Sequence, residues 1–528
     1  MTEPVTGSVS GASRKTGSTI RLRGTAQASI NRCFIAAVIA SGLSGHAQQC
    51  TVDWNDVHQR IDGFGASSAF LNTAWTAVQA DMFFSTNTGI GLSFLRSQIQ
   101  PATSVNGVAY ARANEISLMQ MARDRGARIW STPWTPPNFC KSINSPNGGN
   151  YLGIGGGPTN VLYARQLAGY VATMKASYGV NLYAISIQNE PDYPTSYPSC
   201  VWSGQQFHDF ATNLSATLAA SNAASTRIIM AEDSNWRFDL TTNSMNDAAT
   251  SNVVAVLAAH NYDSSISPAV PVNRQGKALW ETEVSTFDAY DGSITNAMYW
   301  AGQIHLFMTV IEANAWHYWW LISANADNEG LTDNSGNPAK RMYVLGNYSR
   351  FVRPNYYRIG TTNTGGALIS AYQDSLSTSF AIVAINTNNA AINQAFNLTN
   401  FAASTVTPWI TSSSLSLASA STVAVTNAAF TYTLPALSVV TFVGQAVVAP
   451  SNFVISSAAD SGHSVVLSWD AVASATYRVL RTNVLTAPTG NWPAITTGYP
   501  PGGAPGGSLS YTDATATATL NFYRVSSP

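Results

Sequence analysis

The stretch Leu182–Pro191, LYAISIQNEP, decides the fold class of this sequence, because its apolar run Leu182–Gln188 ends abruptly in polar residues. Near-continuous apolar runs of this length are typical of parallel strands that are buried on both faces. Seven further runs of the same kind occur between residues 61 and 321. They are Ile61–Ala66, Leu92–Arg96, Ala127–Thr132, Arg227–Ala231, Val254–Asn261, Lys277–Thr282 and Ala315–Leu321.

Longer amphipathic segments separate these runs. Val161–Tyr178 has apolar residues near helical spacing, and Gln205–Ala219 follows Ser203, which is a suitable N-cap. Eight strands that alternate with helices over about 260 residues have the size and rhythm of a (β/α)8 barrel. The competing α/β architecture is a doubly wound open sheet. A nucleotide-binding sheet of this kind is disfavoured, because no Gly-x-Gly-x-x-Gly motif follows the first run.

The pattern changes after about residue 356, where helical spacing ends and Asn, Ser, Thr and Gly separate short strand-like runs. Such runs predict an antiparallel β-sandwich. They are Ala367–Tyr372, Phe380–Asn386, Ala395–Leu398, Thr405–Ile410 and Phe430–Phe442. A short linker, Val447–Pro450, leads to a last segment whose size and Leu-Ser-Trp-Asp and Tyr-Arg-Val spacing resemble a fibronectin type III module. We expect this module to be a spacer or a sugar-binding accessory.

The N-terminus predicts export. Basic residues from Arg14 to Arg32 precede the apolar run Phe34–Leu43, and Gly45-His46-Ala47 resembles a small-x-small cleavage site. The alternative is a membrane anchor, but this run is much shorter than the roughly 20 residues that span a bilayer. We therefore expect a secreted protein with a signal peptide (1–47), a barrel (48–355), a side β-sandwich (356–446) and the C-terminal module (450–528).

Composition and charge narrow the range of possible binding partners. Only 10% of the residues are charged, and removal of residues 1–47 would take away five basic residues and one acidic residue, shifting the net charge from −1 to about −5. No basic block remains, so neither a nucleic acid nor an anionic membrane is an expected partner. We expect a monomer without a cofactor or a metal ion, because no Cys/His cluster has zinc spacing.

Three cysteines would remain after cleavage, which leaves one thiol unpaired. Cys140 follows one predicted barrel strand and Cys200 follows the next, so the two loops share one rim of the barrel. We therefore expect a disulfide between Cys140 and Cys200.

Two glutamates, Glu190 and Glu283, directly follow apolar strands at the end of the barrel where catalytic groups are found. A carboxylate at such a position costs desolvation energy unless it is paired or used. Each glutamate taken alone could form an ordinary ion pair. Two of them on one rim fit the pair that cleaves a glycosidic bond, with one protonated and the other ionised.

Several sequence blocks make the chain resemble glycoside hydrolase family 30, and its bacterial xylanases more than its glucosylceramidases. The resemblance covers roughly residues 50–445. The blocks are Arg60–Ala66, Gly91–Arg96, Ser131–Pro137, Gln188–Pro191, Ser199–Gln206, Trp280–Glu283 and Lys340–Pro354. It implies a retaining (β/α)8 glycosidase with a tightly fused β-sandwich whose first strand comes from about Gln49–Val57.

The resemblance also implies roles for individual residues. Glu190 would be the acid/base and Glu283 the nucleophile, with their carboxyls about 5–5.5 Å apart. Asn189 would hydrogen-bond the sugar 2-hydroxyl. Arg96, at the end of the second strand, could hold Glu283 ionised.

Aromatic residues and a histidine at strand ends complete the predicted site. Trp134, Trp319 and Trp320 can pack against the apolar faces of sugars, although only one of the adjacent Trp319 and Trp320 can face the cleft. His260 and Tyr262 share one side of their strand, and Tyr262 could hydrogen-bond the nucleophile. For His260 a structural role is an equal alternative.

The segment after the eighth strand departs from the family pattern. Many xylanases of this branch carry there an Arg that grips a glucuronic acid branch, whereas Leu321–Gly330 has no Arg or Lys and carries Asp327 and Glu329. We therefore expect an endo-β-1,4-xylanase that does not depend on glucuronic acid. The alternatives are another β-glycosidase of the family (a β-1,6-glucanase, a glucosylceramidase or an exo-xylosidase) and a non-catalytic carbohydrate-binding protein.

Overall fold

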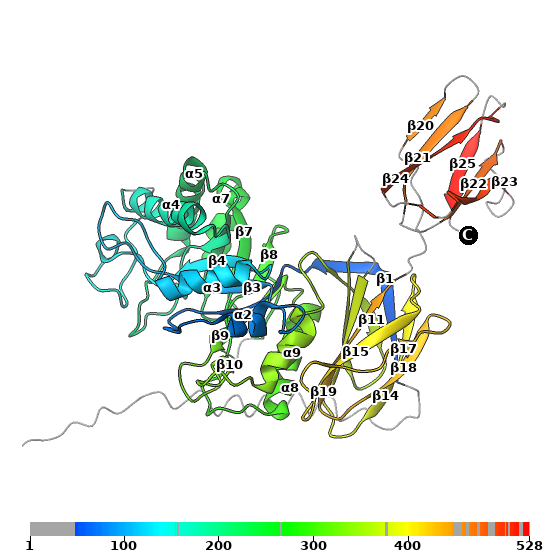
Figure 1. The fold of residues 1–528 in the computed structure, drawn as a ribbon. Helices are drawn as coiled ribbons and strands as arrows, with labels where there is room; N and C mark the ends of the chain where they lie inside the picture. The colour runs from blue at the N-terminus through cyan, green and yellow to red at the C-terminus, as the bar shows by residue number, and fades with distance from the viewer. Residues whose placement is uncertain are drawn as a thin grey trace, which may run out of the picture.

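The computed structural model describes residues 48–446, except 154, 156–157, 264–266 and 375–378, and most of residues 457–526. The predicted signal peptide, residues 1–47, and the predicted linker Val447–Pro450 lie outside the described residues. Figure 1 shows a barrel with helices around it, a β-sheet body beside the barrel, and a small C-terminal β-module.

Eight parallel strands close into a barrel, because the last strand, β9, pairs with both β8 and the first strand, β2. In order around the barrel they are β2 (Gly63–Ser67), β3 (Phe94–Ile99), β4 (Arg128–Pro133), β5 (Leu182–Ser186), β6 (Arg227–Asp233), β7 (Val254–Ala259), β8 (Ala278–Glu281) and β9 (Ala315–Ile322). A short strand, β10 (Gly330–Thr332), lies parallel to β9 outside this ring. The predicted (β/α)8 barrel is therefore confirmed.

Large side chains fill the inside of the barrel below the site. Phe94, Trp130 and Trp280 are fully buried there and contact one another ring to ring. Gly65 lets β2 approach this layer closely, since a Cβ at this position would lie 2.4 Å from the ring of His317. The floor of the site is thus a packed layer of aromatic rings.

Helices surround the barrel as expected from the sequence. The helix α5 begins directly after Ser203, whose side chain accepts from the Gln206 amide while the Gln206 side chain accepts in return. The helices are α2 (Ala77–Phe84), α3 (Ala113–Arg123), α4 (Pro158–Tyr178), α5 (Gly204–Ala220), α6 (Thr242–Met245), α7 (Ala248–Val253), α8 (Ile294–Thr309) and α9 (Lys340–Ser349). Within the described ranges, none of them has the length and apolar character needed to cross a membrane.

The side sheet begins with the N-terminal strand β1 (Gln49–Arg60), which pairs with β11 on one side and β14 on the other. The other strands are β11 (Tyr357–Asn363), β12 (Leu368–Gln373), β13 (Ser379–Asn386), β14 (Ile392–Thr399), β15 (Thr405–Thr411), β16 (Ala418–Ser419), β17 (Val423–Ala424), β18 (Ala429–Leu434) and β19 (Ser438–Gln445). One face carries its own apolar core, with Phe396, Phe430 and Phe442 in mutual ring contact.

The other face of this sheet shares a core with the barrel. Tyr372, Val383 and Val439 belong to the same apolar cluster as the barrel helices. Asn347 of α9 adds hydrogen bonds of 3.0 Å to the Trp409 carbonyl and 3.1 Å to the Thr441 hydroxyl. This shared core makes the barrel and the side sheet one packed body.

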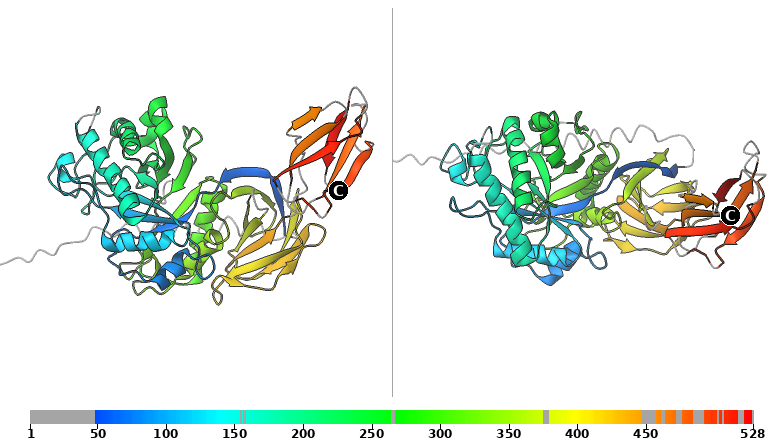
Figure 2. Two further views of the ribbon diagram at one scale, coloured as in Figure 1. Left: turned by 45° about the horizontal axis from the view of Figure 1, so that its top comes forward. Right: turned by 90° about the horizontal axis from the view of Figure 1, so that it is seen from above.

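The C-terminal module consists of two three-stranded sheets around Trp469 and Tyr477. Its strands are β20 (Ser457–Asp460), β21 (Val465–Ala471), β22 (Tyr477–Thr482), β23 (Ala494–Tyr499), β24 (Gly507–Asp513) and β25 (Phe522–Ser526). Figure 2 shows it beyond the side sheet, on the side away from the barrel. Its fibronectin type III character stays a prediction.

Candidate active site

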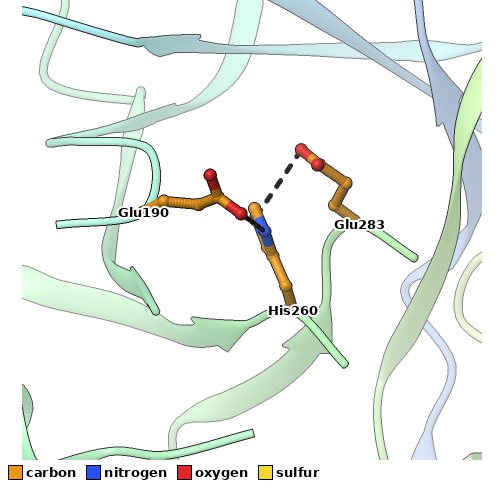
Figure 3. Close-up of side chains that lie close together, drawn as sticks. All are labelled: Glu190, His260 and Glu283. Atoms are coloured by element: carbon orange, nitrogen blue, oxygen red, sulfur yellow. Dashed lines mark hydrogen bonds and ion pairs between the residues drawn. The ribbon is translucent and has the colours of Figure 1, made fainter. Parts of the chain in front are cut away.

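The structure brings Glu190 and Glu283 together at the end of the barrel where β5 and β8 finish (Figure 3). One carboxylate oxygen of each and a ring nitrogen of His260 all lie within 4.8 Å of one another. Both carboxyls reach the surface only slightly, since Glu190 is 6% and Glu283 5% exposed. This spacing fits the short separation of retaining glycosidases and not the wider gap of inverting ones.

The backbone holds both glutamates in place. Glu190 has a φ of +42°, a strained conformation for a residue with a side chain, and its amide donates to the Glu232 carbonyl at 3.0 Å. The amide of Glu283 donates to a carboxylate oxygen of Glu281, also at 3.0 Å. The main-chain amide of each candidate catalytic residue therefore donates a hydrogen bond that helps to hold its backbone in place.

Two donors contact the Glu283 carboxylate. Arg96 forms a buried ion pair with Oε2, and the Tyr262 hydroxyl donates to Oε1 at 2.8 Å. Arg96 and Tyr262 thus contact the carboxylate with which the sequence paired them, while their roles stay predictions. Arg96 also donates to the Asn189 side-chain oxygen at 2.6 Å. Within the described part of the chain the Asn189 amide nitrogen has no partner, so it can donate to a sugar hydroxyl.

His260 lies between the two glutamates (Figure 3) and is fully buried. Its Nδ1 is 3.4 Å from Glu190 Oε1, and its Nε2 is 3.7 Å from Glu283 Oε2. Burial lowers the pKa of His260, but the charge of Glu283, the contact with Glu190 and the nearby Glu232 carboxylate outweigh it and raise the pKa to about 10. His260 is therefore a cation at neutral pH.

The Glu190 carboxylate faces two donors, because the Tyr197 hydroxyl donates to its Oε2 at 2.7 Å in addition to His260 at Oε1. Burial raises the pKa of Glu190, but these contacts and the charges of His260 and Arg96 leave it below its ordinary value. The pKa of Glu283 is raised, by burial first and also by the charge of Glu190, against the charges of His260 and Arg96. Retaining hydrolysis starts from the opposite charge state, so a bound sugar has to alter these contacts.

The tryptophans lie around Arg96. Its guanidinium lies over the rings of Trp134 at 4.7 Å and Trp319 at 5.5 Å, and these two rings are 5.9 Å apart. Trp320 stacks on Trp319 with ring centroids 4.9 Å apart and donates from its indole nitrogen to the Ala69 carbonyl at 2.7 Å, and no contact with Arg96 is found for its ring among the described residues. Trp319 is therefore the member of the adjacent pair that lies beside the catalytic groups.

The sequence did not single out three side chains of this site. Tyr197 lies in the loop after β5, where no periodic pattern gives a signal. Phe287 stacks on Tyr262 with ring centroids 5.7 Å apart and is 56% exposed. Glu232 directly follows a strand run, as Glu190 and Glu283 do, so the same rule could have found it.

The predicted disulfide is not present in the structure. Cys50, Cys140 and Cys200 are all free and buried. Cys140 and Cys200 are neighbours, since the charge of Cys140 is one of the causes that raise the Cys200 pKa. Burial raises the pKa of both thiols to about 12, so the reactive thiolate is scarce at neutral pH.

A metal ion fits this cluster poorly. Glu190, His260 and Glu283 offer ligand atoms at suitable spacing. His260 would first have to lose its proton, and the guanidinium of Arg96 already binds Glu283. The positive charges that pair with these two carboxylates are therefore those of His260 and Arg96.

Comparisons with known proteins agree with this geometry. A sequence profile described as glycosyl hydrolase family 59 matches residues 97–353. The curated glucuronoxylanase XynC of Bacillus subtilis (strain 168) is 32% identical over 414 residues, which cover 75% of this chain and 92% of the relative.

Two solved structures extend the match. The family 30 subfamily 8 xylanase Xyn30A from Clostridium acetobutylicum is 32% identical with a TM-score of 0.66, over 75% of this chain and 99% of that one. A family 30 endoxylanase from Clostridium papyrosolvens C71 is 33% identical with a TM-score of 0.63, over 75% of this chain and 100% of that one. This chain belongs to glycoside hydrolase family 30, among its xylanase-like members.

Proposed function

We propose that this protein is a secreted, retaining endo-β-1,4-xylanase, with Glu190 as the acid/base and Glu283 as the nucleophile. One observation carries the proposal: two strand-end carboxyls lie within 4.8 Å of each other, with sugar-binding groups around them. Relatives that are 32–33% identical over nearly their whole length are named xylanases, which supports xylan as the substrate. The sequence of residues 1–47 supports secretion.

The chemistry follows from the contacts. Glu283 attacks the anomeric carbon while Glu190 gives its proton to the leaving glycosidic oxygen, which forms a glycosyl ester on Glu283. Glu190, now ionised, then takes a proton from a water molecule that attacks the same carbon and releases Glu283. Arg96 and Tyr262 stabilise the Glu283 carboxylate when it leaves again.

Tyr197→Phe is expected to extend activity to higher pH. The variant loses the hydroxyl that donates to the Glu190 carboxylate at 2.7 Å and lowers its pKa. The pKa of Glu190 should rise, so the acid keeps its proton to a higher pH and the basic limb of the kcat profile, which reports the substrate complex, should move up by about 0.5–1 pH unit.

The pH profile of kcat on a soluble xylo-oligosaccharide measures this effect. Tyr178→Phe is the matched control, since Tyr178 is an exposed tyrosine at the end of α4. An unchanged basic limb in Tyr197→Phe, or one at lower pH, would contradict the contact as the cause.

We also propose that the enzyme does not depend on glucuronic acid branches. After β9 the Glu329 side chain accepts from Asn325 at 3.3 Å, and its pKa is raised to about 8, by burial first and then by the hydrogen bond and charge of Asp327. The charge of Glu283 is a further cause, so this segment lies close to the site. Carboxyls at this place cannot attract a uronate, and as they ionise they repel it.

A panel of substrates tests both parts of the proposal. We expect kcat/KM on linear xylan and on glucuronoxylan to agree within about threefold, since Leu321–Gly330 offers the branch no Arg or Lys. A preference for glucuronoxylan above about tenfold would refute the independence. Hydrolysis of β-1,6-glucan without hydrolysis of any xylan would refute the assignment to xylan.

A further inference from the structure

Glu232 is a buried carboxylate that the proposed chemistry does not use. It lies near the end of β6, where the pairing with β7 shifts in register between Ala231 and Asp233, and its φ is +56°. An extra residue in one strand of a pair is a β-bulge, and bulges beside active sites re-aim a side chain. The strained bulge therefore indicates that the direction of this side chain matters.

The Glu232 carboxylate is bound by donors from neighbouring strands. Its Oε1 accepts from Arg96 at 2.9 Å and lies 3.7 Å from His260 Nε2, while its Oε2 accepts from the Thr132 hydroxyl at 2.5 Å. The side chain is 0% exposed, so it does not reach the cleft. Burial raises the pKa of Glu232, but the charges of Arg96 and His260 lower it to about 2, so it is ionised at every working pH.

Both cations that contact Glu232 also contact the candidate catalytic carboxyls. Arg96 is paired with Glu283, and His260 lies against both Glu190 and Glu283. Three carboxyls therefore share two cations in one buried cluster. If Glu232 were neutral, Glu190 and Glu283 would be the only carboxylates of this cluster that Arg96 and His260 stabilise.

We propose that Glu232 is a positioning residue: it is the buried counter-ion that holds Arg96 and His260 charged and in place, and through them sets the pH range of the reaction. This inference rests on the proposed roles of Glu190 and Glu283. It adds that the working pH of these two groups is set by a third carboxylate that never touches the substrate.

The other titratable groups around Glu232 do not compete for this role. His317 of β9 feels the charge of Glu232, but burial lowers the pKa of its ring to about 3, so it is neutral. Burial, together with the charge of Asp192, raises the pKa of the adjacent Asp233 well above its usual range. Glu281 lies near His260 and Glu283, and burial raises its pKa to about 8, so it is mostly neutral at pH 7. Among the described residues the charged groups that contact Glu232 are therefore Arg96 and His260.

Glu232→Gln tests the proposal because it removes one negative charge at constant volume. Glu190 and Glu283 should both ionise more readily, which lowers both pKa values. In the substrate complex the acidic limb of the kcat profile reports ionised Glu283 and the basic limb reports protonated Glu190, so both limbs should move to lower pH by about one unit. On the basic side of the profile this shift lowers kcat about 10-fold.

Two further variants separate charge from packing. Glu115→Gln replaces another buried carboxyl, which accepts from the Gln98 amide and whose pKa burial raises to about 7, so it changes packing with little change in charge below that pH. It should leave both limbs in place. Glu232→Asp keeps the charge but is too short to serve both Arg96 and Thr132. It should lower kcat while both limbs stay near their wild-type positions.

The state of His260 gives a measurement that needs no variant. The NMR signals of its ring should show protonation of both nitrogens at pH 8 in the wild-type protein, and a neutral ring would overturn the proposal. Unmoved limbs in a folded Glu232→Gln, or limbs in Glu232→Asp that move as far as Gln predicts, would also overturn it. Full activity of Glu283→Gln would instead refute the proposed function on which the inference rests.

Discussion

Replacing Glu283 by glutamine is expected to lower kcat/KM on linear xylan by about 10⁴-fold or more. Glutamine has nearly the same shape but cannot attack the anomeric carbon, so no glycosyl ester forms. The site should otherwise persist, because Tyr262 can still donate to the amide oxygen. Reducing-sugar release measures the rate, and mass spectrometry after reaction with an activated 2-fluoro-xylobioside shows whether the ester forms.

The control for this variant is Glu115→Gln, which changes a carboxyl that is also buried, at 1% exposure, but lies outside the site. It should keep its activity within about threefold. Azide adds a stereochemical test on Glu283→Gly, because an anion in place of the carboxylate attacks from the same face and gives the α-azide. Substantial xylan hydrolysis by Glu283→Gln would end the case for this nucleophile.

Replacing Glu190 by glutamine is expected to lower turnover of xylan by about 10³-fold and to spare activated aryl xylosides in the first step. A sugar leaving group needs the proton that Glu190 supplies, whereas an acidic phenol leaves without it. The glycosyl ester on Glu283 should then accumulate, because no base activates the water. A burst of phenol followed by a slow steady state would report this.

Azide also distinguishes this role from that of the nucleophile. It needs no base, so it should restore steady-state turnover of Glu190→Gln on the aryl substrate and give the β-azide. The opposite stereochemical products from Glu190 and Glu283 variants would assign one role to each residue. Equal loss on xylan and on the aryl xyloside would contradict Glu190 as the acid/base.

The barrel and the two candidate catalytic residues could be predicted because their signals are local. A buried parallel strand has to be apolar throughout, so each of the eight strands produced a run in the sequence. A carboxylate directly after such a run is costly unless it is used, and this singled out Glu190 and Glu283. Glu232 follows the same rule. The direction of its side chain, however, depends on the β-bulge that forms where β6 pairs with β7, and the sequence of β6 alone does not show this bulge.

The remaining features depend on contacts between distant segments. The sequence predicted that the side chains of Trp319 and Trp320 alternate. This was wrong, because their rings stack on one another where the pairing of β2 with β9 shifts in register. Tyr197 reaches Glu190 through an irregular loop that carries no periodicity. The disulfide prediction placed Cys140 and Cys200 close together, but it could not anticipate that both would be buried as free thiols.

The position of β1 in the side sheet affects how the chain acquires its structure. Cys50, two residues after the first described residue, pairs with Asn363 on one side and Phe396 on the other. Both partners are synthesised more than 300 residues later, so the first strand cannot find its place until nearly the whole catalytic body has been made. Closing such long loops is entropically costly and slows folding. Compared with a barrel that folds from its own local units, this chain therefore keeps its N-terminal segment unpaired for longer, which would suit the export proposed above, since an exported polypeptide crosses the membrane before it folds.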